Sequence, residues 1–486
     1  MSEPSAAAVK AALAEPVVSA SSKRLLPWLV AVAFFMESLD TTILNTAVPA
    51  VSEALRVSPL AMKSVLASYT LSLAVFIPIS GWMADRFGTR RVFASAIGIF
   101  TLGSFLCGIS SNIHALVACR LLQGCGGAMM VPVGRLTLVR TFAKSELIRV
   151  MSFVAIPALI GPMLGPVAGG LIVGYLHWRF IFFVNIPIGL AGLLLVHMHL
   201  PDYREEATCP LDTVGMILFG SGVALLSYVL EIFGEHTLSL AEILGLLVVA
   251  LALIGGYGLH ALRSEFPLLQ LKLFQIRTFR AAVTGGFVTR IGIGGVPFLL
   301  PLLYQVGLGF TPTQSGMLIM PQALGAMASK TVINQVLQRI GYRGMLASNT
   351  ILLGILLFLF ATIGLGTPVW LIVLQAFVYG VFTSLQYTSM NTLGYADLTE
   401  AQTSNGSSIA STMQQLAISF GVATAGLTTA LFVPGREIAT PMEMIRGVHK
   451  ALILLGVLTI VSTAVFRSLK AGDGSKVSSE KLAHSG

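Results

Sequence analysis

The chain has 486 residues, of which 55% are hydrophobic and only 10% are charged. A soluble protein carries about 25% charged residues, so this composition excludes a string of soluble domains and indicates a polytopic membrane protein. The formal net charge of +9 does not indicate nucleic-acid binding, because most Lys and Arg residues lie in short breaks between apolar runs, as the anchors of membrane loops do.

Apolar runs of about 20 residues span the hydrocarbon core of a bilayer, and the sequence contains about fourteen of them. Each is expected to be helical, because lipid offers backbone N–H and C=O groups no other partner. The expected fold class is therefore an all-α polytopic membrane protein. The predicted segments are about 25–48, 62–83, 91–110, 113–138, 150–174, 179–200, 212–233, 241–262, 280–304, 313–337, 344–365, 368–393, 405–433 and 449–467.

The distribution of Lys and Arg predicts the orientation of these segments. Alternate loops, starting from the N-terminus, hold most of the cations, including Arg86, Arg90 and Arg91, whereas the opposite loops hold few. The positive-inside rule places both termini in the cytoplasm. Residues 1–24 have no apolar core and no cleavage pattern, so they are expected to form a cytoplasmic tail rather than a signal peptide.

The longest internal loops divide the chain. They cover about 201–211 and 263–279 and bracket two segments that are poor in mid-span polar groups, while the six segments before and after are richer in Gly, Pro and polar side chains. Two six-helix halves around a midplane site are a known transporter plan. The predicted organisation is an N-terminal tail (1–24), a six-helix bundle (25–200), loops with two inserted helices (201–279), a second six-helix bundle (280–467) and a C-terminal tail (468–486).

Two carboxylates lie inside the first predicted segment. Glu37 and Asp40 are three residues apart, so they share a helix face. An ionised Asp at mid-bilayer costs roughly 2.5–3.5 kcal/mol, so such residues usually face a water-filled interior and serve a function. A carboxyl there can take up and release a proton, which makes Asp40 the predicted proton-coupling site. The alternative is a carboxyl paired permanently with an intramembrane arginine for packing.

The loop after the second segment places one acid and three cations around a tight glycine turn. Such a loop can hold neighbouring helix ends through charge and helix-dipole contacts, and release them as two halves rock. The spacing closely resembles the signature loop of the major facilitator superfamily, and the resemblance extends over nearly the whole chain. The residues that carry the loop motif are Gly81, Asp85, Arg86, Gly88, Arg90 and Arg91.

Arg120 lies in the fourth segment, where a guanidinium remains charged and needs a carboxylate, a carbonyl or water nearby. The surrounding residues resemble the superfamily's motif for this helix. In that family the arginine is associated with proton transfer or with charge balance for the acid of the first helix. The resemblance therefore implies that Arg120 assists Asp40, and we expect Glu37, on the same helix face as Asp40, to assist as well. The alternative is an arginine that only locks two helices together.

The fifth segment carries glycines four residues apart, which make a flat face for close helix approach, and prolines, which bend the helix. Taken physically, this pattern predicts only a tight, kinked interface. It also resembles the antiporter motif of the superfamily, which accompanies exporters that exchange substrate for protons. The motif residues are Gly161, Pro162, Gly165, Pro166, Gly169 and Gly170.

Further stretches resemble the fourteen-helix drug:proton antiporter branch of EmrB/QacA type. They are Leu39 to Pro49, His177 to Gly189 and Leu211 to Gly215. The resemblance implies a monomeric carrier in a bacterial inner membrane, which exports small amphipathic compounds by alternating access and has protons and the lipid bilayer as its other partners. No P-loop is present, so ATP is not expected as the energy source, and neither a cofactor, a metal nor an enzymatic activity is expected.

The second half supplies most of the polar and aromatic side chains of the expected substrate cavity. Arg290, near mid-span, is expected either to line the cavity or to pair with an acid of the first segment. The predicted cavity residues are Asn45, Gln123, Arg290, Gln322, Tyr379, Gln386, Tyr387, Gln414 and Gln415. The arginines leave open a dedicated exporter of one anionic metabolite, and a non-transporting membrane sensor on the same fold is the third possibility.

Overall fold

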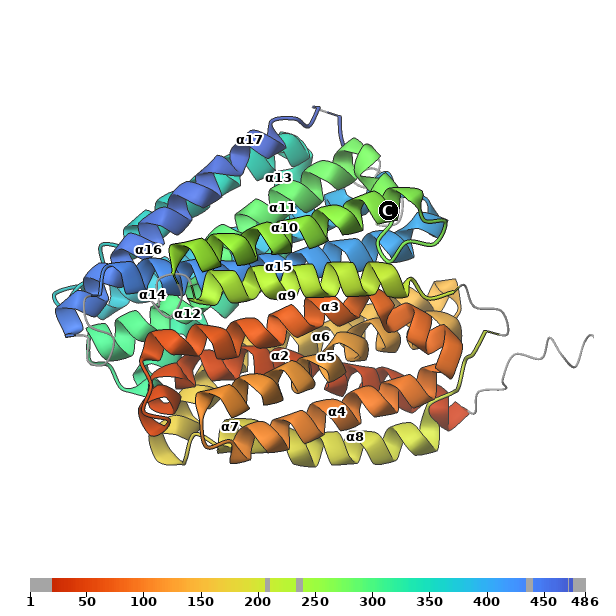
Figure 1. The fold of residues 1–486 in the computed structure, drawn as a ribbon, viewed down its shortest axis with the longest axis horizontal. Coiled ribbons are helices and arrows are strands. Elements are labelled where there is room, and N and C mark those ends of the chain that lie inside the picture. Colours follow the sequence, from red (N-terminus) through yellow and green to blue (C-terminus); the bar gives the residue numbers. More distant parts are fainter. Residues whose placement is uncertain (1–19, 206–209, 233–238, 434–439, 471, 475–486) are drawn as a thin grey trace, which may run out of the picture.

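The computed structural model describes residues 20–205, 210–232, 239–433, 440–470 and 472–474, and all the regular structure in this part of the chain is helical. The long helices run side by side as one bundle (Figure 1). This arrangement satisfies backbone hydrogen bonds within each segment, as a bilayer requires. The all-α prediction is confirmed.

The first half of the bundle precedes residue 200. A 3₁₀ turn, η1 (Pro59–Met62), leads into its second long helix, and the side chain of Asn112 caps another by accepting a hydrogen bond from the Ala115 amide. The helices are α2 (Ala20–Ala54), α3 (Lys63–Phe87), α4 (Thr89–Ile109), α5 (Ile113–Thr141), α6 (Lys144–Tyr175), the short α7 (Phe180–Phe183) and α8 (Asn185–His199).

The second half starts at Arg277, after two intervening helices, α9 (Thr213–Ile232) and α10 (Leu240–Arg263), and a 3₁₀ turn, η2 (Leu271–Gln275). Its first span is built from three consecutive helical pieces. The elements of this half are α11 (Arg277–Gly294), α12 (Val296–Pro301), the π-helix η3 (Leu302–Gly307), α13 (Pro312–Phe360), α14 (Val369–Tyr395), α15 (Glu400–Leu431), α16 (Pro441–Val461) and the short α17 (Thr463–Phe466).

The helices account for all fourteen predicted segments. Eleven helices of the described chain are long and apolar enough to cross a membrane, and one of them, the 49-residue α13, contains two predicted segments. Gly341 separates these two, with φ 66° and ψ 172°, a backbone conformation that favours glycine. α6, with an apolar stretch over Ile160–Tyr175, and α15 complete the set. The structure thus has two six-helix halves and two extra helices.

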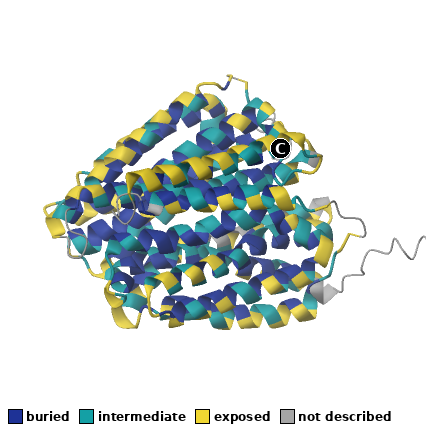
Figure 2. Ribbon diagram, in the orientation of Figure 1, coloured by how far each residue is buried: buried dark blue, intermediate teal, exposed yellow. Residues whose placement is uncertain are grey.

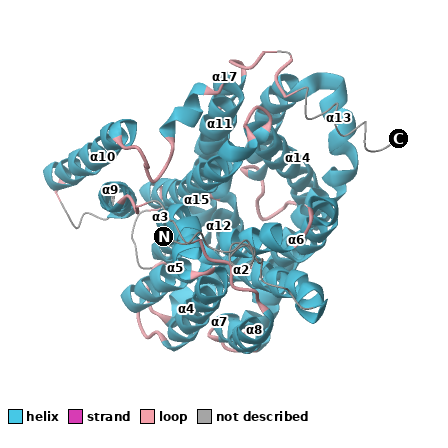
Figure 3. Ribbon diagram, turned by 90° about the vertical axis from the view of Figure 1, so that its right-hand side faces the viewer, coloured by secondary structure: helices cyan, strands magenta, loops and turns pink. Residues whose placement is uncertain are grey.

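The extra helices α9 and α10 lie along the side of the bundle (Figure 3). An apolar cluster joins them to both halves, because it includes Phe219 and Tyr257 from these helices, Ala74 from α3, and Phe279 and Leu416 from the second half. Exposed residues lie on the outside of the bundle (Figure 2). Many of them are large and apolar, for example Leu244, Val248 and Leu251 on α10. Such a surface suits lipid contact.

The two halves meet directly at the end of the bundle where α2 ends and α13 begins. Three hydrogen bonds cross between them in the described chain: Gln305 Nε2 donates to the Thr46 carbonyl at 2.9 Å, Thr313 Oγ1 to the Gly170 carbonyl at 3.1 Å, and Ser419 Oγ to the Ala67 carbonyl at 3.3 Å. The largest apolar cluster also contains residues of both halves at this end, including Val51 and Leu303. This end, opposite the N-terminus, is therefore closed.

Close packing between α13 and α14 gives a test of the fold. A Cβ atom at Gly380 would overlap the backbone carbonyl of Gln322, and no side-chain rotation can relieve that overlap. We expect Gly380→Ala to destabilise the protein by about 1–3 kcal/mol, as overpacking does, and to lower the melting temperature of the purified protein.

Gly245→Ala is the matched control. Gly245 lies inside α10, and no neighbouring atom comes within 4 Å of the position that a Cβ atom would take there. Alanine is also the better helix former. Equal melting temperatures for the two variants would contradict the close approach of α13 and α14.

Candidate functional site

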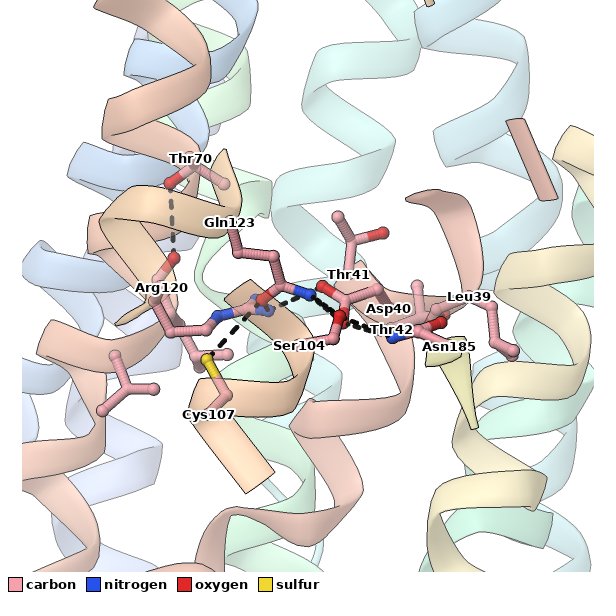
Figure 4. Close-up of polar contacts among 12 residues, drawn as sticks. Leu39, Asp40, Thr41, Thr42, Thr70, Ser104, Cys107, Arg120, Gln123 and Asn185 are labelled. Atoms are coloured by element: carbon pink, nitrogen blue, oxygen red, sulfur yellow. Dashed lines mark hydrogen bonds and ion pairs between the residues drawn. The ribbon is translucent and has the colours of Figure 1, made fainter. Parts of the chain in front are cut away.

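Asp40 is the centre of a buried polar cluster at the core of the first half. Its side chain is 1% exposed, and its carboxylate accepts hydrogen bonds from side chains of two other helices (Figure 4). Arg120 Nη1 donates to Oδ2 at 2.6 Å, Gln123 Nε2 donates to Oδ1 at 2.8 Å, and Asn185 Nδ2 donates to Oδ1 at 3.0 Å. A buried carboxylate with these donors has the partners that its burial demands.

Arg120 supplies the charge that balances Asp40. The guanidinium is 1% exposed, forms the ion pair at 2.6 Å and also donates to Gln123 Oε1 at 2.6 Å. The Tyr69 ring lies 4.3 Å from its Cζ atom and covers one face, which is a cation–π contact. The need for a partner, predicted from sequence, is met by the acid of the first helix.

Ser104 on α4 completes the group. Gln123 Nε2 donates to Ser104 Oγ at 2.7 Å, and Asn185 Nδ2 reaches the same oxygen at 3.4 Å. We call Asp40, Ser104, Arg120, Gln123 and Asn185 the Asp40 cluster. It joins α2, α4, α5 and α8, and Gln123, predicted as a cavity residue, belongs to it.

The sequence analysis gave no role to Ser104 or Asn185. A signal existed for Asn185, because it is the single amide of α8, whose other polar side chains are the two histidines of its last turn. Asn185 is completely buried in the structure. Ser104 offers no such signal, since serines are common in membrane helices and bond to their own backbone.

Glu37 is outside the hydrogen-bonded cluster. It lies on α2 one turn closer to the N-terminus than Asp40 and is half-buried. Its charge interacts with those of Asp40 and Arg135, and in the described chain it has no hydrogen bond or salt bridge.

The loop motif is attached to the segment that follows α8. Asp85 Oδ1 accepts from Arg140 Nη2 at 2.8 Å, and the same Nη2 donates to Glu205 at 2.7 Å. The backbone N–H of Arg90 donates to Asp202 Oδ1 at 3.0 Å. Gly88 has φ 94°, and a Cβ atom there would overlap the Asp202 carboxylate. The loop thus connects the C-terminal ends of α3, α5 and α8 and the start of α4, while Gly81, Arg86 and Arg91 are exposed.

The glycines of α6 permit close contact on two sides, as the pattern predicted. Cβ atoms at Gly161, Gly165 and Gly169 would each collide with α2, whose Thr42 and Thr46 hydroxyls donate to α6 carbonyls. Gly170 instead faces the start of α13 in the other half. Pro162 and Pro166 lie inside the same helix. The motif therefore connects the Asp40-bearing helix to the contact between the halves.

A pocket in the second half has Arg290 in its wall. The pocket is a small opening between α11, α14 and α15, and part of it is open to solvent. Arg290 donates to Asn391 Oδ1 at 2.9 Å, and its Cζ lies 5.0 Å from the Tyr387 ring. Of the two alternatives for Arg290, the structure supports a cavity-lining position, because Arg290 lines the pocket and neither Glu37 nor Asp40 forms a salt bridge with it.

The other predicted cavity residues do not line this pocket. Gln386 is completely buried and accepts from Asn349 Nδ2 at 2.8 Å, and the Tyr379 ring packs edge-on against Phe360. Asn45 donates to the Thr41 carbonyl of its own helix at 3.4 Å. The side chains of Gln322, Gln414 and Gln415 are half-buried.

The fold defines a polytopic membrane protein built from two six-helix halves, a plan known from membrane transporters. The Major Facilitator Superfamily profile matches residues 30–422, so the chain belongs to this superfamily. It is therefore a membrane transporter with multiple membrane-spanning helices.

Curated relatives and solved structures agree with this assignment. The chain is 42% identical over 405 residues to a putative multidrug resistance protein MdtD of Serratia proteamaculans (83% of this chain, 85% of the relative), and 42% identical over 405 residues to that of Escherichia coli (83% and 86%). A POT family transporter in complex with 5-aminolevulinic acid has the same fold, with a TM-score of 0.66, 17% identity and coverage of 90% and 94%. So does an inward-facing, unoccupied bacterial homologue of the lysosomal transporter Spinster, with a TM-score of 0.64, 12% identity and coverage of 96% and 98%.

The ion pair between Asp40 and Arg120 can be tested without a transport assay. We expect Arg120→Gln to cost about 3–5 kcal/mol of stability, because it leaves a buried carboxylate without its charged partner. Removing the second charge as well, in Asp40→Asn/Arg120→Gln, is expected to recover part of this loss, with a coupling energy of about 0.5–3 kcal/mol.

Thermal unfolding of the two single variants, the double variant and the unaltered protein measures the coupling. If the effects of the single substitutions simply add in the double variant, the two side chains do not interact as described.

Proposed function

We propose that this transporter is a proton-coupled exporter of small amphipathic compounds. The observation that carries the proposal is the Asp40 cluster, in which one buried carboxylate inside a membrane helix is held by donors that can rearrange. The relatives named as multidrug resistance proteins support drug-like compounds as the exported class. The proton gradient would supply the energy, without a cofactor.

The chemistry of the cluster suits two protonation states. An ionised carboxylate only accepts hydrogen bonds, and Asp40 has three donors around it. A protonated carboxyl must donate one hydrogen bond. The amides of Gln123 and Asn185 carry both a donor and an acceptor, so rotation of one amide presents an oxygen to the new O–H. Asn185 Oδ1 is buried without a hydrogen-bond partner in the described chain and is available for this role.

Arg120 and Glu37 would have different parts in proton transfer. The guanidinium keeps its charge, so when Asp40 takes up a proton the ion pair is lost and Arg120 must seek another partner. This is a physical reason for protonation to change the packing of α2 against α5. Glu37, between Asp40 and the N-terminal end of α2, would pass the proton onward to the cytoplasm.

Alternating access would reverse the closure observed at the α2–α13 end. With the N-terminus in the cytoplasm, as the loop cations predict, the closed end faces outward and the Arg290 pocket lies towards the cytoplasm. The α6 glycines connect the Asp40-bearing helix to the contacts between the two halves at the α2–α13 end. A change in the packing of α2 on protonation of Asp40 would therefore reach these contacts through α6. We further propose a monomer in the bacterial inner membrane that does not bind nucleic acid.

Proton movement in everted membrane vesicles tests the proposal. The vesicle interior is first made acidic, and cationic, neutral and anionic lipophilic compounds are added in turn. We expect some compound to collapse the pH gradient in vesicles with the unaltered protein. We expect Asp40→Asn to reduce that response to the level of vesicles without the protein, since the substituted amide cannot exchange the coupling proton.

Glu53→Gln is the control, because Glu53 is an exposed carboxylate on the same helix, and its response is expected to match that of the unaltered protein. If no compound collapses the gradient and Asp40→Asn is indistinguishable from the unaltered protein, proton-coupled export is the wrong function. The single-metabolite exporter and the sensor would then be the better explanations.

A further inference from the structure

The Arg290 pocket extends from the cytoplasmic ends of its helices to mid-span. α11 contributes Phe279 near its start and Arg290 near its end, while α14, which runs the opposite way, contributes Met390 and then Tyr395. Arg290 is thirteen residues into α11, which is roughly 20 Å at the rise of an α-helix. The guanidinium-bearing residue therefore marks the deep end of the pocket, and the exposed Tyr395, the last residue of α14, marks its mouth.

Arg290 differs from Arg120 in having no acidic partner. Its side chain is only 5% exposed, yet in the described chain no carboxylate lies within salt-bridge distance of it. The aromatic rings of Tyr387 and Tyr395 are the titratable groups that face it. A charged side chain at this depth is costly, and where it has no compensating charge it usually marks a substrate pathway.

The guanidinium is oriented but not saturated. One N–H bonds to Asn391, and the Tyr387 ring lies 5.0 Å from Cζ, so these two contacts determine where the group points. A guanidinium has five N–H donors in a planar fork that matches a carboxylate. Gly286 lies next to the Arg290 guanidinium on the same helix. A Cβ atom at Gly286 would be 2.7 Å from Arg290 Nη1, so this glycine makes room for the guanidinium.

Apart from Asn391 and Tyr395, the remaining wall of the pocket is apolar. Phe279, Val283, Met390 and Met413 line it, and methionines accommodate apolar bodies of different shape. A pocket with one uncompensated cation at its deep end and an apolar wall is complementary to an amphipathic anion.

We infer that this pocket binds lipophilic carboxylates, with the carboxylate on Arg290 and the apolar body against the methionines and Phe279. This inference rests on the proposed export function and names its substrate class. Asn391 and Tyr387 act as positioning residues for the guanidinium. The inside-negative membrane potential assists the exit of an anion, so both components of the proton-motive force favour its exchange for protons.

Equilibrium binding to the purified protein tests the assignment without any gradient. The probes are 2-naphthoate, its neutral amide 2-naphthamide, and the cationic 2-naphthylmethylamine, which share one aromatic body. We expect the carboxylate to bind at least about tenfold more tightly than the amide, as a charge-assisted hydrogen-bonded pair implies. Arg290→Gln should remove this preference and leave the affinity for the amide unchanged.

Three further variants separate charge from position. Arg290→Lys is expected to keep part of the preference, because it keeps the charge and loses the fork. Gly286→Ala is expected to reduce the preference by displacing the guanidinium. Arg280→Gln removes an exposed cation from the same helix and should leave the preference intact.

The assignment is overturned if the unaltered protein does not bind the carboxylate or binds the amide as tightly, or if Arg280→Gln has the effect of Arg290→Gln. The assignment is also overturned if Arg290→Gln keeps its fold but no longer binds any of the three probes, since that pattern indicates a general packing defect. Asp40→Asn should keep the carboxylate preference, so failure of this inference is distinguishable from failure of proton coupling. Gradient collapse by cationic compounds alone would leave the export function standing and refute the anion pocket.

Discussion

The structure depends on the rule that a charge buried among membrane helices must find its partners in the protein, because lipid supplies none. Asp40 obtains them from α5 and α8, and Gln123 and Asn185 both extend the contacts to Ser104 on α4. Moving any of these helices by a few ångström would break hydrogen bonds that nothing outside the bundle can replace. The cluster therefore determines how the helices of the first half sit against one another, whatever its role in transport.

The buried arginines of the two halves differ in whether a carboxylate balances their charge. In the first half Arg120 is neutralised at 2.6 Å by Asp40, both side chains are buried, and the Tyr69 ring covers one face of the guanidinium. In the second half Arg290 has an amide and a ring as neighbours, and it borders open space. One half thus contains a closed site whose charge balance a proton can alter, and the other contains an open site whose charge balance is incomplete. This division agrees with the proposed carrier, in which the proton binds in the first half and the exported compound binds in the second half.

Much of the fold followed from local properties of the sequence. Apolar length located all fourteen segments, and Gly341 lies in the short break predicted between the two spans that α13 contains. The pairing of Asp40 with Arg120 was accessible because each charge alone demanded a partner. The remaining site residues depend on contacts between helices far apart in the chain. Gln386 is a polar residue on a membrane helix, like a cavity residue in every local respect, and only its contact with Asn349 shows that it serves packing.

The hydrogen bonds between the two halves at the end where α2 ends and α13 begins all use main-chain carbonyls as acceptors, at Thr46, Gly170 and Ala67. Each hydrogen bond contributes about 0.5–1.5 kcal/mol net, so the three together contribute only a few kcal/mol. A free-energy difference of this size between two conformations still leaves the minor one populated. The polar part of this gate is thus weak enough for ordinary thermal opening. Because every residue type provides a carbonyl, a substitution at Thr46 or Ala67 can leave its bond in place, while a substitution at a donor position, Gln305, Thr313 or Ser419, removes the bond. Gly170 is the exception among the acceptors, because a Cβ atom there would overlap the Pro312 carbonyl.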